Sequence, residues 1–96
     1  MQAVLNSNVN ISEKLDFLLA DVDANTKNDV ENSIVALGAR AVNALVEKLT
    51  SLKGLQRGIV AMSLIRIGES AIAPLQNLAS ENAEFQWMAD YLLSEI

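Results

Sequence analysis

The sequence contains no cysteine and no histidine. Without cysteine the chain can form neither a disulfide nor a thiolate nucleophile, and without both residue types it lacks the usual ligands of structural zinc. The absence of histidine also removes imidazole acid–base chemistry. We therefore predict a protein that is not an enzyme and that holds no metal and no cofactor.

Turn-forming and aromatic residues are also scarce. The chain has 4 Gly, 1 Pro and 4% aromatic residues, while 51% of its residues are hydrophobic. An all-β fold needs many tight turns, and this composition supplies too few residues for them. The apolar residues are mostly Ala, Leu, Ile and Val, which suit the core of closely packed helices. The composition predicts an all-α fold.

Long apolar runs are missing as well. No segment approaches the roughly eighteen consecutive apolar residues of a membrane-spanning helix. Residues 1–11 have neither a basic start nor a long apolar stretch, so they do not look like a secretory signal. Together with the lack of cysteine, this predicts a cytoplasmic protein with no membrane partner.

Positive charge is limited too. The chain carries 12 acidic against 7 basic residues, a net charge of −5, and the basic residues form no run. Such a chain repels nucleic-acid phosphates and anionic lipids, so we expect no nucleic-acid partner.

Apolar residues recur at helical spacing along almost the whole chain. Six helices are expected, at about residues 12–22, 26–37, 39–50, 55–67, 70–79 and 85–96. Ser12 is predicted to cap the first, and Thr26 the second, with Asp29 completing a near capping box. Phe17 is expected to widen the apolar stripe of the first helix.

An internal repeat connects these helices. Residues 34–45 read IVALGARAVNAL and residues 64–75 read LIRIGESAIAPL, so that a shift of 30 places Gly38 on Gly68. A glycine at each junction permits a positive φ, which lets one helix end and the next begin without a spacer. The repeat predicts one domain, residues 1–96, of three helical hairpins, at about residues 11–37, 39–67 and 69–96.

The segments ALGARAVNAL and RIGESAIAPL resemble the HEAT-like repeats of the phycobiliprotein-lyase type. Arg57 and Lys27 look like the characteristic basic residue of that repeat, and Pro74 looks like its helix proline. The resemblance implies an α-solenoid of three stacked antiparallel helical hairpins, a short HEAT-like array. We expect Arg57 and Lys27 to contact acids or carbonyls of the neighbouring repeat.

The segment Asp21–Asn25, DVDAN, has acids at alternate positions, as the start of a calcium-binding loop does. The loop glycine is replaced by Thr26 and the twelfth-position glutamate by Asn32, so calcium binding is not expected. Asp21 and Asp23 are interpreted as solubilising a hairpin tip.

The second helices of the hairpins should line the concave side of the array. One row on them holds Asn32, Met62 and Tyr91, where exposed apolar side chains favour contact with another protein. The alternative is that the curvature of the array buries part of this row as core. Trp87 either covers the open end of the last hairpin, the favoured reading, or forms an interaction hot spot. The candidate partner-binding residues are Asn32, Val35, Met62, Ile65, Arg66, Trp87 and Tyr91.

Three functions fit this reading. The first is a protein-interaction module, or adaptor, that binds a partner on the concave face. The others are an auxiliary subunit of a lyase-type enzyme, which the resemblance implies, and an acidic inhibitor or immunity-type protein that masks a basic site. The apolar last helix also predicts a homodimer formed through it.

Overall fold

Helices are the only regular secondary structure in the described part of the chain. The computed structural model describes the backbone from Gln2 to Ile96 and the side chains from Ile11 onwards. The helices are α1 (Gln2–Leu19), α2 (Lys27–Leu37), α3 (Val42–Ser51), α4 (Gly54–Ile67), α5 (Ile72–Glu81) and α6 (Gln86–Glu95). Short 3-10 turns, η1 (Gly38–Ala41), η2 (Glu69–Ala71) and η3 (Ala83–Phe85), lead into α3, α5 and α6. The predicted all-α class is confirmed, since residues 2–96 contain no strand.

The two predicted helix caps, Ser12 and Thr26, do not act as caps in the structure. Ser12 lies inside α1, so its prediction as a cap is wrong. Serine is a weak signal for a helix start because it is also tolerated inside helices, at a cost below about 0.7 kcal/mol. Thr26 does precede α2, but its side chain makes no capping hydrogen bond to the helix, and the capping box with Asp29 is not formed.

Asp23 organises the turn before α2 instead. Its Oδ1 accepts hydrogen bonds from the backbone N–H groups of Asn25 and Thr26, at 2.9 and 3.0 Å. In return, the Thr26 hydroxyl accepts from the N–H of Asp23 at 3.0 Å. The Asp23 carboxylate and the Thr26 hydroxyl thus each accept from the backbone N–H of the other residue, which is the reciprocal pattern of a capping box. The role of Asp23 is therefore structural.

The two repeat junctions share one backbone conformation. Gly38 has φ 69° and ψ −152°, and Gly68 has φ 86° and ψ −128°. Both lie in a region that is open almost exclusively to glycine. Each glycine ends a helix and is followed by a 3-10 turn and a new helix. The positive φ predicted for the two junctions is confirmed.

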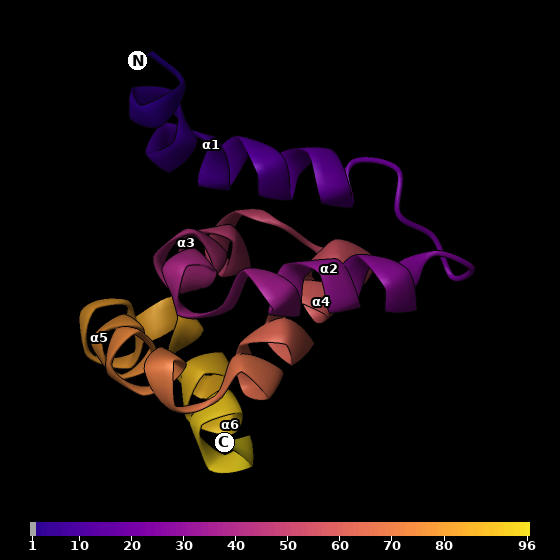
Figure 1. Cartoon of the computed structure of the whole chain (residues 1–96). Coiled ribbons are helices and arrows are strands. Elements are labelled where there is room, and N and C mark those ends of the chain that lie inside the picture. The colour runs from indigo at the N-terminus through magenta and orange to yellow at the C-terminus, as the bar shows by residue number, and fades with distance from the viewer. Residues whose placement is uncertain (1) are drawn as a thin grey trace.

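The helices pack in a regular order. Within successive pairs, α1 contacts α2, α3 contacts α4, and α5 contacts α6. Between pairs, α3 contacts both α1 and α5, while α4 contacts both α2 and α6. Figure 1 shows this progression, with α1 at the top and α5 and α6 at the bottom. One series therefore consists of α1, α3 and α5, and the other of α2, α4 and α6.

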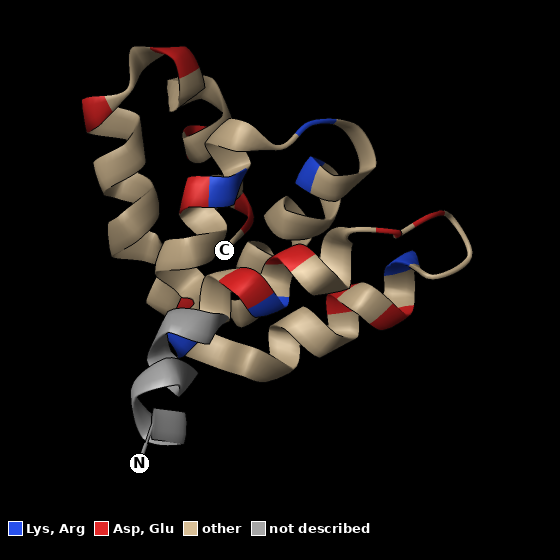
Figure 2. Ribbon diagram, turned by 90° about the horizontal axis from the view of Figure 1, so that it is seen from above, with Lys and Arg blue, Asp and Glu red and all other residues tan. Residues whose placement is uncertain are grey.

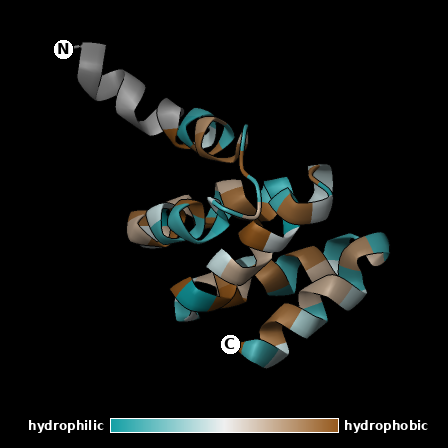
Figure 3. Cartoon of the chain, turned by 90° about the vertical axis from the view of Figure 1, so that its right-hand side faces the viewer, coloured by the Kyte–Doolittle hydropathy of each residue, from teal (hydrophilic) through white to brown (hydrophobic). Residues whose placement is uncertain are grey.

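One apolar core runs through all six helices. Its fully buried side chains include Leu15, Leu19, Ile34, Leu45, Leu49, Val60, Leu64, Leu75 and Leu92. Figure 3 shows hydrophobic and hydrophilic residues on different sides of the helices, as expected for helices with one apolar stripe. The pairs Ile34 and Leu64, and Leu45 and Leu75, are equivalent in the repeat and equally buried.

Phe17 is a correction to the predicted stripe of the first helix. It is 81% exposed, whereas Leu15 and Leu19 on either side of it are buried. Residues two apart on a helix point to nearly opposite sides, so Phe17 cannot share the face that Leu15 buries.

No single helix in residues 2–96 is long and apolar enough to cross a bilayer. The segments Gly54–Ile67 and Glu69–Glu81 reach that length and hydropathy together, but they are bent by 115° at the break between them.

Candidate functional site

Large apolar side chains are exposed mainly on α4 and α6. The exposed fractions are 41% for Leu55, 47% for Met62, 67% for Trp87 and 57% for Tyr91. Monomeric proteins bury most such side chains, and a group of them marks an interaction site more often than a single one does. We call these four residues the α4–α6 surface.

The register of the two helices places these side chains on the same side. A shift of 29 residues carries the buried residues of α4 onto buried residues of α6: Ile59 onto Met88, Val60 onto Ala89, and Ser63 onto Leu92. The same shift carries Met62 onto Tyr91. Because α4 and α6 pack against each other, Met62 and Tyr91 occupy equivalent positions on adjacent helices. Trp87 lies one turn before Tyr91 on α6.

The structure brings most of the predicted row to the surface. Asn32, Met62 and Tyr91 are exposed, whereas Val35 and Ile65 are half-buried. Ile65 also packs against the core. Each of the two alternatives for this row therefore holds in part: Asn32, Met62 and Tyr91 face solvent, whereas Ile65 joins the core.

Trp87 does not cover the end of the last hairpin, so the favoured reading of this residue is wrong. Its side chain is 67% exposed. The inward face of α6 is already filled by Met88, Ala89 and Leu92, all buried. Trp87 lies beside that stripe, where no other element covers it in the described part of the chain.

Arg66 connects α4 to α2. Its Nη1 donates to Glu31 Oε2 and to Asn32 Oδ1, each at 2.9 Å. The Glu31 side chain is 18% exposed and that of Arg66 43%, so the pair is shielded from water on the glutamate side only. Arg66 and Asn32, both among the candidate partner-binding residues, are thus bound to each other.

Arg57 of α4 contacts Phe85 of η3, a different contact from the one predicted. Its guanidinium carbon lies 5.5 Å from the centroid of the Phe85 ring, a cation–π geometry. Its Nε is buried and has no hydrogen-bond partner. The predicted contact to an acid or carbonyl is wrong because an aromatic side chain occupies that position. Lys27 is exposed.

A shallow depression of about 450 Å³ lies between α2 and α4, next to the α4–α6 surface. It is lined by Lys27, Asn28, Glu31, Leu55, Gly58, Ile59 and Met62. A Cβ at Gly58 would meet no atom within 4 Å, so this glycine leaves the floor of the depression open. The apolar side chains of α4 therefore adjoin a polar wall on α2.

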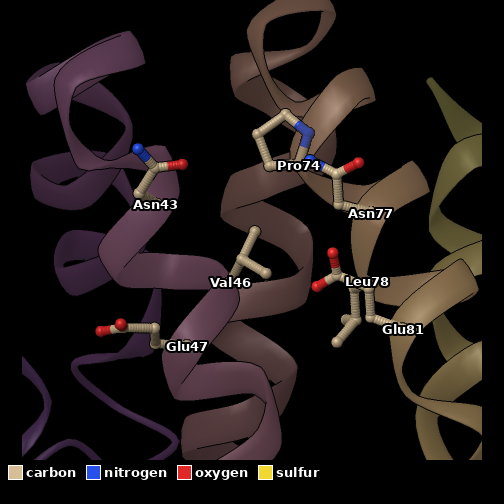
Figure 4. A pocket seen from close by; sticks show the side chains of 7 residues that line it. All are labelled: Asn43, Val46, Glu47, Pro74, Asn77, Leu78 and Glu81. Carbon is tan, nitrogen blue, oxygen red and sulfur yellow. The ribbon is translucent and has the colours of Figure 1, made fainter.

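A second depression, of about 320 Å³, lies between α3 and α5 on the other series of helices. Figure 4 shows Val46 of α3 facing Leu78 and Glu81 of α5, with Asn43 and Glu47 beside Val46. None of its lining residues is a large exposed apolar side chain; Pro74 and Asn77 complete the lining. The stronger candidate for a binding face is therefore the α4–α6 surface.

Charge is distributed unevenly along the chain. Residues 69–96 contain five acids and no Lys or Arg, whereas residues 1–68 contain seven of each sign. The net charge of −5 therefore belongs to the part of the chain that includes α5 and α6 (Figure 2). The ion pairs among the described side chains are Lys48 with Asp16 and Arg66 with Glu31, and neither includes an acid of this part.

Acidic side chains in the described part of the chain do not cluster as the ligands of a metal ion would. No group of three or more His, Cys, Asp or Glu side chains there is arranged to hold a metal ion. The Asp23 carboxylate of the DVDAN segment accepts backbone hydrogen bonds in the turn before α2.

Comparison with known proteins returns no match, whether with protein families, with curated proteins or with solved structures. The function is therefore argued from the geometry of this chain.

Ion quenching of tryptophan fluorescence tests the local charge. Trp87 is the only tryptophan, and exposed acids lie one turn before and after it, at Glu84 and Asp90. The resulting negative potential attracts cations and repels anions. With quenching constants normalised to N-acetyl-tryptophanamide, we expect caesium to exceed iodide by about twofold or more.

The variant Glu84→Gln/Asp90→Asn should reduce that ratio towards one, whereas Glu13→Gln/Asp21→Asn, with the same change in net charge, should leave it unchanged. Equal quenching by the two ions in the native chain would contradict the charge assignment.

Proposed function

We propose that this chain is a non-catalytic protein-interaction module that binds a partner protein through the exposed side of α2, α4 and α6. Its architecture is proposed to be a short HEAT-like α-solenoid of three stacked antiparallel hairpins. The regular order of helix contacts supports this, since each helix touches its hairpin partner and its counterpart in the next hairpin. The shared backbone conformation of Gly38 and Gly68 supports it too.

The α4–α6 surface is the observation that carries the proposal. Leu55, Met62, Trp87 and Tyr91 are each at least 41% exposed and lie on two adjacent helices. Met, Tyr and Trp are enriched at protein interfaces, and Trp and Tyr are over-represented among hot spots. Two packed helices also hold these side chains on rigid supports, which lowers the ordering entropy lost on binding.

In this proposal the chain itself has no catalytic role. The chain offers neither a thiol nor an imidazole. Its contribution is to place an apolar surface next to the polar side chains of α2. Arg66 of α4 is hydrogen-bonded to Glu31 and Asn32 of α2, which links the two helices beside the depression between them.

Affinity capture with matched variants tests the proposal. The immobilised native chain, the variant Met62→Ser/Tyr91→Ser and the control Phe17→Ser are each exposed to extract of the source cells. Phe17 is more exposed than either Met62 or Tyr91, but it lies on α1 in the other series of helices. We expect proteins retained by the native chain and the control to be lost from the double variant.

All three substituted side chains are at least 47% exposed, so circular dichroism should show unchanged folding. Retention of the same proteins by all three chains, or by none, would refute the proposed binding face.

A further inference from the structure

Acidic side chains flank the aromatic residues of α6. Glu84 lies three residues before Trp87, Asp90 three residues after it, and Glu95 four residues after Tyr91. Asp90 and Glu95 lie on α6 itself, where residues three and four apart are neighbours on the helix surface, about 5–6 Å apart at Cβ. Glu84 lies in η3, the 3-10 turn that leads directly into α6. Glu84, Asp90 and Glu95 are all exposed. The exposed side of this hairpin therefore alternates aromatic rings with carboxylates.

The last hairpin has no basic side chain that could pair with these acids, because residues 69–96 contain no Lys or Arg. The two arginines of α4 have other partners: Arg66 is bonded to Glu31 and Asn32 of α2, and Arg57 lies over the ring of Phe85. At the position equivalent to Arg66, α6 has Glu95. None of the acids of residues 69–96 forms an ion pair with a side chain in the described part of the chain.

We propose that the partner bound on the α4–α6 surface presents a segment rich in Lys and Arg. This inference rests on the proposed function and names the chemistry of the partner. The aliphatic stems of these residues cover apolar surface, and their charged ends remain able to reach Glu84, Asp90 and Glu95. Guanidinium and ammonium groups are also attracted to the faces of Trp and Tyr rings.

Charge favours this occupant over a second copy of the chain. Two copies meeting symmetrically through α6 would place the same acidic hairpin on both sides of the interface. Each hairpin contributes five acids and no base, so like charges would face each other. A basic segment would contact the same aromatic residues while its Lys and Arg side chains are attracted to the acids of residues 69–96.

Selection from a peptide library tests the proposal. Random peptides of about 16 residues, enough for roughly four helical turns, are displayed on phage and selected on the immobilised chain at low ionic strength. We expect the selected peptides to be enriched in Lys and Arg relative to the input library. A synthetic selected peptide should change the fluorescence of Trp87, the only tryptophan.

Two sets of variants separate the contributions to affinity. Trp87→Ser should weaken binding of the selected peptide by about 30-fold or more, as for an aromatic hot spot. Glu84→Gln/Asp90→Asn/Glu95→Gln should weaken it by about tenfold, since an exposed ion pair changes affinity by a factor of about 1.4 to 5. The control Glu13→Gln/Asp21→Asn/Glu47→Gln makes the same change in net charge away from this surface, and should weaken binding by less than about twofold.

The outcomes distinguish this inference from the proposed function. Selected peptides that are neutral, and whose binding is lost in Met62→Ser/Tyr91→Ser but not in the acid variant, would leave the binding face in place and overturn the basic partner. Peptides that bind the double serine variant as tightly as the native chain would overturn both. A stable dimer in light scattering that Trp87→Ser dissociates would show that a second copy occupies the surface, which also overturns the basic partner.

Discussion

Leu64→Ala is expected to lower the free energy of unfolding by about 2–5 kcal/mol, the range for removing a fully buried leucine side chain. Leu64 is 0% exposed and lies on α4, which packs against α2, α3 and α6. Its loss leaves a cavity where the two series of helices meet. A chain of this size has a total stability of roughly 5–14 kcal/mol, so this single change removes a large part of it.

Urea denaturation followed by circular dichroism measures the effect, and the midpoint should fall by about 1–3 M. Leu55→Ala is the matched control because it makes the same chemical change on the same helix. Leu55 is 41% exposed, so its truncation should change stability by less than about 1 kcal/mol. Equal losses in the two variants would mean that the core is not centred on α4.

Gly38→Ala and Gly68→Ala are each expected to destabilise the fold by about 1–3 kcal/mol, because each forces an L side chain into a backbone conformation that it strongly disfavours. Steric crowding is not the cause. A Cβ at Gly38 would meet no atom within 4 Å, and one at Gly68 would meet only backbone oxygens at 3.9 Å. If the two junctions are independent, the double variant should lose about the sum of the single effects.

Gly58→Ala provides the control with the opposite sign. Gly58 lies within α4 and does not have a positive φ, and the space around it is open. Alanine at such a helical position should stabilise the chain by about 0.5–1 kcal/mol. Thermal unfolding of the three single variants tests both signs at once. A loss at Gly38 no larger than the change at Gly58 would show that the junction conformation imposes no constraint.

Much of the fold was predictable because its signals are local. The apolar spacing of Leu15, Leu19, Leu45 and Leu49 follows the helical period, and all four are buried. The glycine junctions were predictable for a similar reason, since a positive φ depends on the residue itself more than on its neighbours. Helix starts were less reliable, because serine and threonine next to a helix end need not act as caps.

The candidate site was only partly predictable. The row containing Met62 and Tyr91 could be located from the repeat alone, because equivalent positions point in the same direction. The environment of Trp87 could not, since sequence shows that an aromatic residue is present but not whether the neighbouring helices leave room for it in the core. The partner of Arg57 was missed for the same reason: Phe85 is 28 residues away, and only packing brings the two side chains together.

The sequence by itself determined the helical class, the two glycine junctions at a 30-residue shift, and the apolar stripes that form the core. These depend on the conformational preference of single residues and on the helical period. Only the tertiary structure decided that Trp87 is exposed, that Arg66 joins α4 to α2, and that Arg57 lies over Phe85. Those outcomes depend on how whole helices pack, because burial and long-range contacts are properties of the assembled core rather than of any local segment.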